Sequence, residues 1–251
     1  MAQIIAVANQ KGGVGKTFLV FHLAHFLHEV GYRVLALDLD PQGNLTLSFK
    51  LAQNSSDDSC LVAEIFERER LLTEELAPGL FLGSSGIKLA RYEAISSGVG
   101  IYFKLKKALG RYLLEHEIDY VLIDCPPSLG LFSLSAFVAA DKLLVPLRAE
   151  IFSVSGLGDL LNVVSEVQEN INSRLYVAGL VLNAVNERTK VARETLTELQ
   201  ENQALPVLAA IPATIKVEEA LRAGIPLWHF DPSHKVAKSL REALQKVIQA
   251  F

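Results

Sequence analysis

The chain of 251 residues is poor in cysteine and contains only Cys60 and Cys125. Two cysteines cannot form the multiple-disulfide framework on which small secreted domains depend. No apolar stretch approaches the ~18 residues of a membrane-spanning helix. The N-terminus also lacks the basic region and long apolar core of a secretory signal peptide. These absences predict a cytoplasmic protein without a transmembrane helix.

An excess of basic charge is missing as well, since the formal net charge is −4 at pH 7. The chain therefore has no global attraction to a phosphate backbone, and nucleic-acid binding would need a local patch. Hydrophobic residues make up 50% of the sequence, which is enough for a substantial core. Strand-like runs alternate with helical patterns from end to end. This alternation predicts a single α/β domain over residues 1–251, with a mostly parallel twisted sheet and helices on both faces.

A glycine-rich segment lies between the first strand-like run, residues 4–8, and a helical run over residues 18–30. Residues 11–17 of this segment spell KGGVGKT. A strand, a glycine-rich turn and a helix N-terminus form a phosphate cradle, in which Lys16 supplies a full positive charge. The Thr17 hydroxyl would stand where a phosphate-bound Mg²⁺ sits. The pattern predicts a nucleoside triphosphate site, the alternative being an ordinary glycine-rich β–α turn.

The loop differs from the ordinary P-loop, which has glycine at the position of Gln10. With a second lysine, Lys11, at its entrance, the segment resembles the deviant Walker A ATPases. These include ParA-type partition proteins, MinD-type division-site proteins and nitrogenase iron proteins. The resemblance implies that Lys11 crosses an ATP-bound dimer to the partner's nucleotide; the alternative is a solvated lysine. It also implies that ATP contacts Gly12, Gly13, Val14, Gly15, Lys16, Thr17 and Phe18, although Phe18 replaces a hydroxyl residue that contacts the α-phosphate in relatives.

Two carboxylates follow the apolar run of residues 34–37, at the start of the segment DLDPQGN. Because they lie two residues apart at a strand end, they share one face beside the phosphate site. One could position the attacking water and the other could hold Mg²⁺ through its water shell. The segment resembles the ParA switch I, which implies that Asp40 orients the water and Asp38 serves the metal. The alternative is a polar loop with Pro41 and Gly43 as turn residues.

A third apolar run, residues 120–123, ends in Asp124 and continues as Cys-Pro-Pro-Ser. An aspartate at the end of a buried strand is typical of a Walker B motif, in which it holds Mg²⁺ through water. The segment also matches the ParA switch II. Nitrogenase iron proteins bridge a cluster through two cysteines in glycine-rich segments, and neither Cys60 nor Cys125 lies in one. That branch of the family is therefore rejected.

Residues farther along complete the resemblance. Asn183 ends a strand-like run and is an adenine contact by family position, and Pro212 lies near the base in relatives. Arg148 stands where the family usually has glutamine. His22, His25 and His28 recur at every third residue and raise the alternative of a metal site. Since zinc helices usually pair their ligands at i and i+4, the spacing favours a chance run on a helix face.

ParA-type proteins bind DNA non-specifically as ATP dimers, through basic residues in the C-terminal third. The candidates here are Arg188, Lys190, Arg193, Lys216, Arg222, Lys235, Lys238 and Arg241. For each of them, a solvated helix face is the alternative. Ala213 follows Pro212 where relatives have arginine, which is a departure from the family in this region.

A MinD-type membrane switch is the second interpretation, because such proteins end in a short amphipathic basic helix. The last helical run has an apolar stripe at Val236, Leu240, Leu244, Val247, Ile248 and Phe251. The same stripe is what a closing helix needs to pack on a sheet, and we favour packing. A third class, a small-molecule kinase or ligase on the same scaffold, would need an acceptor-binding insertion, and none is evident.

The combined prediction is a ParA-like partition ATPase of the short kind, because no helix-turn-helix segment precedes the loop. By the resemblance it would form a homodimer with ATP and Mg²⁺ and bind non-specific DNA at the nucleoid. A ParB-like partner or a cargo adaptor would stimulate hydrolysis, and hydrolysis would release the dimer.

Overall fold

The computed structural model describes residues 1–53, 59–95, 98–148, 155–185 and 205–251, together with residues 189, 194, 197 and 199. The strands are β1 (Gln3–Val7), β2 (Val34–Asp38), β3 (Glu74–Ala77), β4 (Leu80–Gly83), β5 (Tyr120–Asp124), β6 (Lys142–Arg148), β7 (Tyr176–Val185) and β8 (Val207–Pro212). Over the described ranges they form one sheet in the order β3-β4-β2-β5-β1-β6-β7-β8. All neighbours pair in parallel except β3 and β4. The predicted α/β fold with a mostly parallel sheet is confirmed.

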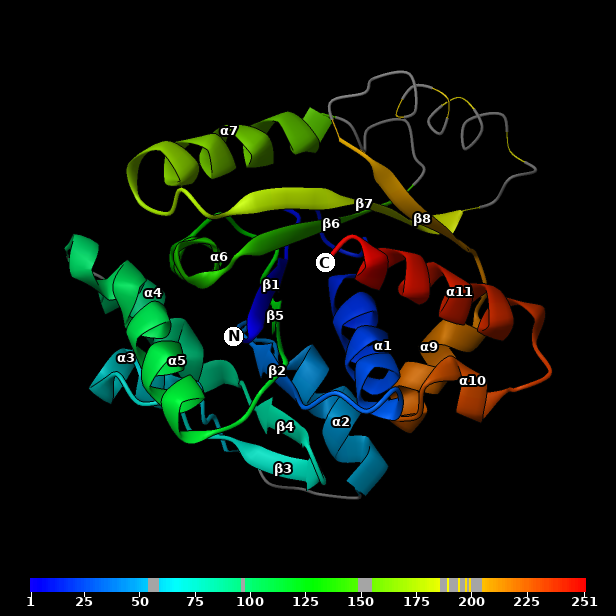
Figure 1. Ribbon diagram of the computed structural model, residues 1–251, viewed down its shortest axis with the longest axis horizontal. Coiled ribbons are helices and arrows are strands. Elements are labelled where there is room, and N and C mark those ends of the chain that lie inside the picture. The colour runs from blue at the N-terminus through cyan, green and yellow to red at the C-terminus, as the bar shows by residue number, and fades with distance from the viewer. Residues whose placement is uncertain are drawn as a thin grey trace.

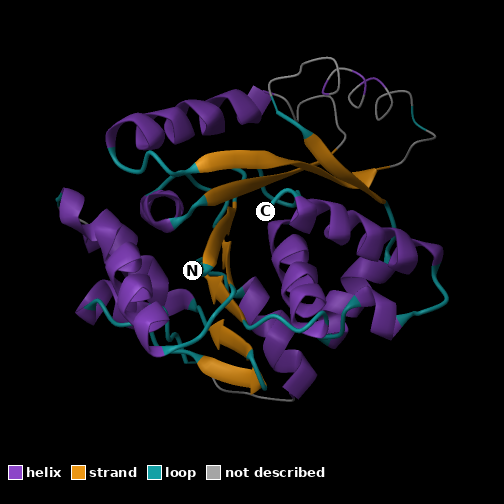
Figure 2. Ribbon diagram, in the orientation of Figure 1, coloured by secondary structure: helices purple, strands orange, loops and turns teal. Residues whose placement is uncertain are grey.

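Helices cover both faces of the sheet (Figures 1 and 2). One face carries α1 (Lys16–Glu29), α2 (Asn44–Gln53), α9 (Lys216–Ala223), α10 (Leu227–Phe230) and α11 (Lys235–Gln249). The other carries α3 (Ala63–Arg68), α4 (Arg91–Ile95), α5 (Lys104–Glu115), α6 (Leu131–Ala139) and α7 (Ser155–Asn170), with the 3₁₀ turns η1 (Ile87–Ala90) and η2 (Val99–Phe103). Each face of the sheet thus has its own apolar core.

Burial on nearly all sides distinguishes α1 from the surface helices. Its residues from Phe18 to Leu27 are almost all buried, because the sheet, α2, α10 and α11 surround it. His22 is fully buried: Nδ1 donates to the Phe18 carbonyl at 2.9 Å, and Nε2 accepts from the Leu227 N–H at 3.2 Å. Burial lowers the pKa of His22 to about 3, so the ring is neutral. Both of its nitrogens serve protein groups, which leaves neither for a metal.

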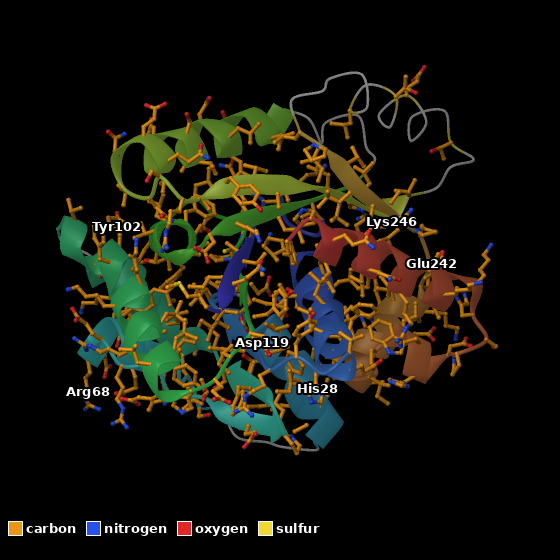
Figure 3. The ribbon with its side chains drawn as sticks, viewed as in Figure 1. His28, Arg68, Tyr102, Asp119, Glu242 and Lys246 are labelled. Atoms are coloured by element: carbon orange, nitrogen blue, oxygen red, sulfur yellow. The ribbon has the colours of Figure 1, made fainter. Side chains whose placement is uncertain are left out.

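The apolar stripe of the last helix faces inward. Val236, Leu240, Leu244 and Val247 are buried in the core that α11 forms with α1 and the sheet. The opposite face carries charged side chains such as Glu242 and Lys246, which point outward (Figure 3). The expectation that this stripe packs on the sheet is confirmed. Within the part of the chain that the structure describes, no helix has the length and apolarity to cross a membrane.

The topology determines where a ligand can bind. Strand β1 lies between β5 and β6, so the chain extends the sheet to one side through β2 and to the other through β6 and β7. In open α/β sheets, ligands bind at the carboxyl ends of the strands where this reversal occurs. The glycine-rich loop follows β1 at that point, and Asp38 and Asp124 end neighbouring strands in register.

Candidate functional site

The glycine-rich loop has the backbone conformation that a phosphate cradle needs. Gly13 and Gly15 have φ angles of 72° and 97°, in the left-handed region that favours glycine. A Cβ atom at Gly15 would lie only 1.9 Å from Asn183 Nδ2, so a side chain there would also clash. Gly15 is the N-cap of α1, and the N-terminus of this helix therefore points at the loop.

Lys16 lies folded inside this loop. Its side chain is almost completely buried, and Nζ donates to the carbonyl oxygens of Asn9 at 3.0 Å and Lys11 at 3.3 Å. Burial lowers the pKa of the ammonium group, while the neighbouring Asp124 carboxylate raises it. The ammonium group is thus held at the cradle by neutral carbonyls, which an anion can displace.

Asn9 anchors the loop and was not predicted from the sequence. Its Nδ2 donates to the Pro146 carbonyl of β6 at 2.8 Å, and its Oδ1 accepts from the Lys11 N–H at 2.9 Å. A polar residue between a strand and a glycine-rich loop was the available signal. The entrance of the loop, including Lys11, is therefore tied to the neighbouring strand through a buried amide.

Asp124 and Thr17 form the metal-binding part of the predicted site. Thr17 Oγ1 donates to Asp124 Oδ2 at 2.7 Å. Asp124 Oδ1 is buried and has no hydrogen-bond partner among the described residues. Burial, and next the nearby Asp38 carboxylate, raise the pKa of Asp124 well above its usual range. A bound cation with its water shell would satisfy the Oδ1 atom and relieve the repulsion, so these residues fit Mg²⁺.

Asp38 is equally buried, but its oxygens have protein partners. Its Oδ2 accepts from the N–H and the hydroxyl of Thr46, at 2.9 and 2.8 Å, and its Oδ1 accepts from the Asp40 N–H at 3.1 Å. Burial raises the pKa of Asp38 to about 6. The structure thus places Asp38 beside Asp124, while its carboxylate accepts hydrogen bonds from Thr46 of α2 and from the Asp40 backbone.

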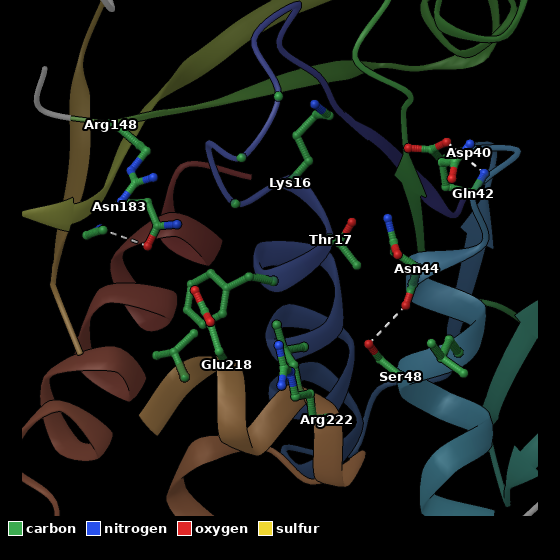
Figure 4. A pocket seen from close by; sticks show the side chains of 18 of the residues that line it. Lys16, Thr17, Asp40, Gln42, Asn44, Ser48, Arg148, Asn183, Glu218 and Arg222 are labelled. Carbon is green, nitrogen blue, oxygen red and sulfur yellow. Dashed lines mark hydrogen bonds between the residues drawn. The ribbon is translucent and has the colours of Figure 1, made fainter. Parts of the chain in front are cut away.

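Asp40 reaches a cavity of about 710 Å³ that the P-loop borders (Figure 4). It is half-buried, and its Oδ1 accepts from the Gln42 N–H at 2.9 Å. The cavity brings together three of the predicted segments and residues at the carboxyl ends of β6, β7 and β8. Its lining includes Gly12, Gly13, Gly15, Lys16, Thr17, Phe18, Asp40, Pro127, Arg148, Asn183 and Pro212.

Asn183, the predicted adenine contact, lines the cavity, and its side chain also contacts the P-loop. Its Nδ2 donates to the Val14 carbonyl at 3.1 Å, and its Oδ1 accepts from the Ala184 N–H at 2.9 Å. Ala184 has a φ of 53°, an uncommon left-handed conformation for a residue with a side chain. The second amide hydrogen and the second lone pair of Asn183 remain available for a ligand in the cavity.

Helix α9 forms the wall of the cavity opposite the loop, which the sequence did not predict. Val217, Glu218, Leu221 and Arg222 of this helix all line it. Arg222, a candidate DNA contact, lies in the wall of the cavity (Figure 4). A charge pattern along a helix identifies a face of the helix but not the element that the face meets.

The other basic candidates differ in their surroundings. Arg241 donates to Glu29 Oε2 at 2.8 Å and lies over the rings of Phe26 and Trp228. Lys216 pairs with Glu219 at 2.7 Å. The exposed Lys238 lies 3.9 Å from Glu242, and Lys235 is exposed at the start of α11. Arg188, Lys190 and Arg193 lie outside the described residues.

Comparisons with known proteins agree with this geometry. Residues 2–177 match the AAA_31 family, described as an AAA domain. The chain is 31% identical to the sporulation initiation inhibitor protein Soj of Bacillus subtilis, over 98% of each chain. It is 32% identical to the chromosome partitioning protein ParA of Caulobacter vibrioides, over 91% of this chain and 87% of that protein.

Two solved structures extend the comparison. A cobyrinic acid a,c-diamide synthase from Mycobacterium smegmatis with bound ADP and magnesium is 32% identical, with a TM-score of 0.77. The alignment covers 99% of this chain and 95% of that one. McdA from Cyanothece, in its apo form, is 24% identical with a TM-score of 0.84, over 99% of this chain and all of that one. At that identity the second likeness shows the fold alone.

Proposed function

The chain belongs to the ParA/Soj-like P-loop ATPases of the AAA_31 family, and from this premise we propose that it hydrolyses ATP to ADP and phosphate with Mg²⁺. One observation carries the proposal. The buried Asp124 Oδ1 has no partner in the described residues, while Asp124 Oδ2 accepts from the hydroxyl of Thr17, which lines the cavity together with Lys16 and Asp40.

Each of these residues has a role that follows from its position. The amides of the loop and the Lys16 ammonium neutralise the phosphates. Thr17 and Asp124 would hold the water shell of the cation, with Asp38 next to them. When bound, the cation withdraws charge from the β- and γ-phosphates. Asp40 orients the attacking water, since its carboxylate is at the cavity and not engaged in the Thr17–Asp124 pair.

We further propose that ATP drives dimerisation and that the dimer binds DNA non-specifically. The support is the similarity to proteins named for chromosome partitioning, and the position of Lys11 at the loop entrance, where Asn9 anchors its backbone. In this scheme the protein is cytoplasmic and associates with the nucleoid. A ParB-like partner or a cargo adaptor stimulates hydrolysis, which returns the dimer to its weakly binding state.

A second candidate is a ligase that uses ATP to activate a carboxylate. The similarity to the diamide synthase favours it. The two candidates differ in stoichiometry, because a ligase consumes ATP only when its carboxylate and amine acceptors are present. The MinD-type alternative has less support, because α11 uses its apolar face for the core.

The test measures ATP consumption and DNA binding with the same purified protein. We expect hydrolysis of ATP without any acceptor, its loss when EDTA removes Mg²⁺, and its loss in Lys16→Ala. Binding to non-specific duplex DNA should require ATP, be weak with ADP, and fall with salt. No ATP consumption without an acceptor would contradict the ATPase assignment. ATP-dependent binding to liposomes without DNA binding would instead favour the MinD-type switch.

Dimerisation has its own test. Lys11→Ala should lower either the dimer fraction with ATP, measured by light scattering, or the turnover rate, measured by phosphate release. Unchanged behaviour in both assays would contradict the proposed contact of Lys11 with the partner's nucleotide.

A further inference from the structure

The loop that carries Asp40 is fastened from the side by Ser85, a residue that follows β4. Ser85 Oγ donates to the Asp40 carbonyl at 2.8 Å, and the Ser85 N–H donates to Thr46 Oγ1 at 2.8 Å. Ser85 is buried, with 5% of the residue exposed. It is not among the residues that line the nucleotide cavity. Its bonds therefore act on the loop and not on a ligand in the cavity.

The direction of every hydrogen bond in this network is determined. A backbone N–H can only donate, so Thr46 Oγ1 accepts from Ser85 and must use its single hydrogen for Asp38 Oδ2. The other oxygen of Asp38 accepts from the Asp40 N–H. Asp38, Thr46, Ser85 and Asp40 thus form a closed ring of hydrogen bonds. The ring needs an acceptor at Asp38 and a hydroxyl at both Thr46 and Ser85.

The ring holds the backbone of Asp40 on both sides. Asp38 binds its N–H, and Ser85 binds its carbonyl oxygen. The neighbouring turn is also packed closely, because a Cβ atom at Gly43 would lie 3.4 Å from the Ser85 carbonyl oxygen. With its peptide groups held at both ends, the Asp40 side chain keeps a fixed origin from which it reaches the cavity.

We propose that Ser85 is a positioning residue for ATP hydrolysis, which acts by fixing the Asp40 backbone through its hydroxyl. The proposal rests on the function proposed above. A carboxylate that orients water must be placed to within a fraction of an ångström, and small displacements at distant residues lower the rate strongly. Loss of the hydroxyl should therefore lower kcat and leave the affinity for ATP unchanged, because the phosphates and the base contact other residues.

Ser84 supplies a matched control within the same chain. It precedes Ser85, is fully buried, and its Oγ donates to the Ser59 carbonyl at 2.8 Å and accepts from the Leu61 N–H at 3.4 Å. Its hydroxyl thus makes bonds of the same kind to a different loop. A purely structural role for serine hydroxyls here would affect both variants alike.

The experiment compares Ser85→Ala, Ser85→Thr and Ser84→Ala in single-turnover and steady-state ATP hydrolysis, with ATP affinity measured by nucleotide titration. We expect kcat to fall about 3- to 10-fold in Ser85→Ala, as the loss of one buried hydrogen bond to the loop predicts. The affinity for ATP should stay within about 2-fold of wild type. Ser85→Thr retains the hydroxyl and should recover most of kcat, whereas Ser84→Ala should keep wild-type kcat.

Specific outcomes would overturn the proposal. It fails if Ser85→Ala keeps the wild-type kcat, or if Ser84→Ala lowers kcat equally. If Ser85→Ala does not fold, Ser85→Cys replaces it, because a thiol of similar size donates only weakly and should give the same kcat defect. Absence of hydrolysis by the wild-type protein would instead contradict the proposed function. A wild-type enzyme with unaffected Ser85 variants would contradict this inference alone.

Discussion

The carboxyl edge of the sheet and the C-terminal helices differ in how their polar side chains are organised. At the sheet edge, Lys16, Thr17 and Asp40 line one cavity, and hydrogen bonds of 2.7 to 3.1 Å tie them to the loop backbone and to the aspartates that end β2 and β5. In α9 and α11 the basic side chains have separate partners, and one of them lines the cavity instead of the outer surface. A ligand site at converging strand ends can thus be recognised from short motifs in the sequence. A basic surface for DNA cannot, because its exposure depends on contacts between distant segments.

The largest expected effect is in the first region, at Asp40. Asp40→Ala should lower kcat for ATP hydrolysis by about 100- to 10,000-fold, because the group that orients the water is lost. ATP binding should persist, since Lys16, Thr17 and the loop glycines are unchanged. The protein should then accumulate as the ATP-bound dimer.

Phosphate release, nucleotide binding and light scattering measure the three parts of this prediction. Gln42→Ala is a matched control, because Gln42 lines the same cavity but contacts Asp40 through its backbone N–H. If Asp40→Ala hydrolyses ATP at the normal rate, a residue other than Asp40 orients the attacking water.

The position of these groups could be predicted because each motif ends a strand. Parallel strands bring their carboxyl ends together, so KGGVGKT, DLDPQGN and the segment around Asp124 had to meet. The strands themselves were placed closely: β2 and β5 include the predicted runs of residues 34–37 and 120–123, and β7 includes the predicted run that ends at Asn183.

The supporting contacts could not be predicted, because they join residues far apart in the sequence. Asn9 binds the carbonyl of Pro146 across 137 residues, and Ser85 binds Asp40 across 45. Arg241 meets Glu29 across 212 residues. A sequence shows that Arg241 lies on a helix face, but not that an acidic residue and two aromatic rings occupy the space beside it.

The next prediction concerns His22, which lies where α1 packs against the C-terminal helices. This residue joins α1 to α10 through the Leu227 N–H, and burial lowers its pKa to about 3. The native state therefore binds no proton at His22 near pH 5, whereas the unfolded chain does so below pH 6.5. His22 should therefore lower the stability as the pH decreases through that range, by about 1.6 kcal/mol between pH 6.5 and pH 5.

Urea denaturation at both pH values, on wild type and His22→Gln, isolates this contribution. Glutamine does not titrate, so the variant should lose about 1.6 kcal/mol less than wild type over the same interval. Parallel losses in the two proteins would show that His22 is not the group responsible.

A smaller effect on stability is expected at Arg241. This prediction separates a structural role of a basic residue in the C-terminal helices from a DNA contact. Arg241→Ala removes the bond to Glu29 and the contact with the Phe26 and Trp228 rings. Because the pair is partly exposed, we expect a loss of about 1 kcal/mol in the free energy of unfolding at pH 7. DNA affinity should change little, since this side chain faces α1. A stable Arg241→Ala variant with much weaker DNA binding would instead make Arg241 a DNA contact.

The smallest effect concerns Lys238, whose ammonium group is exposed and lies 3.9 Å from Glu242. If it contacts one DNA phosphate, Lys238→Ala should reduce the salt dependence of binding by about one unit in the log–log slope, with the unfolding free energy unchanged. Glu242→Gln is the matched variant, because it removes a negative charge where Lys238→Ala removes a positive one. Glu242 lies on the outer face of α11 (Figure 3), and without its carboxylate DNA binding in the ATP state should be stronger. Both substitutions lie on one exposed face. A general disturbance of this face would change DNA affinity in the same direction in both variants, whereas a phosphate contact of Lys238 requires changes in opposite directions. Equal slopes for wild type and both variants would move the DNA contact away from α11.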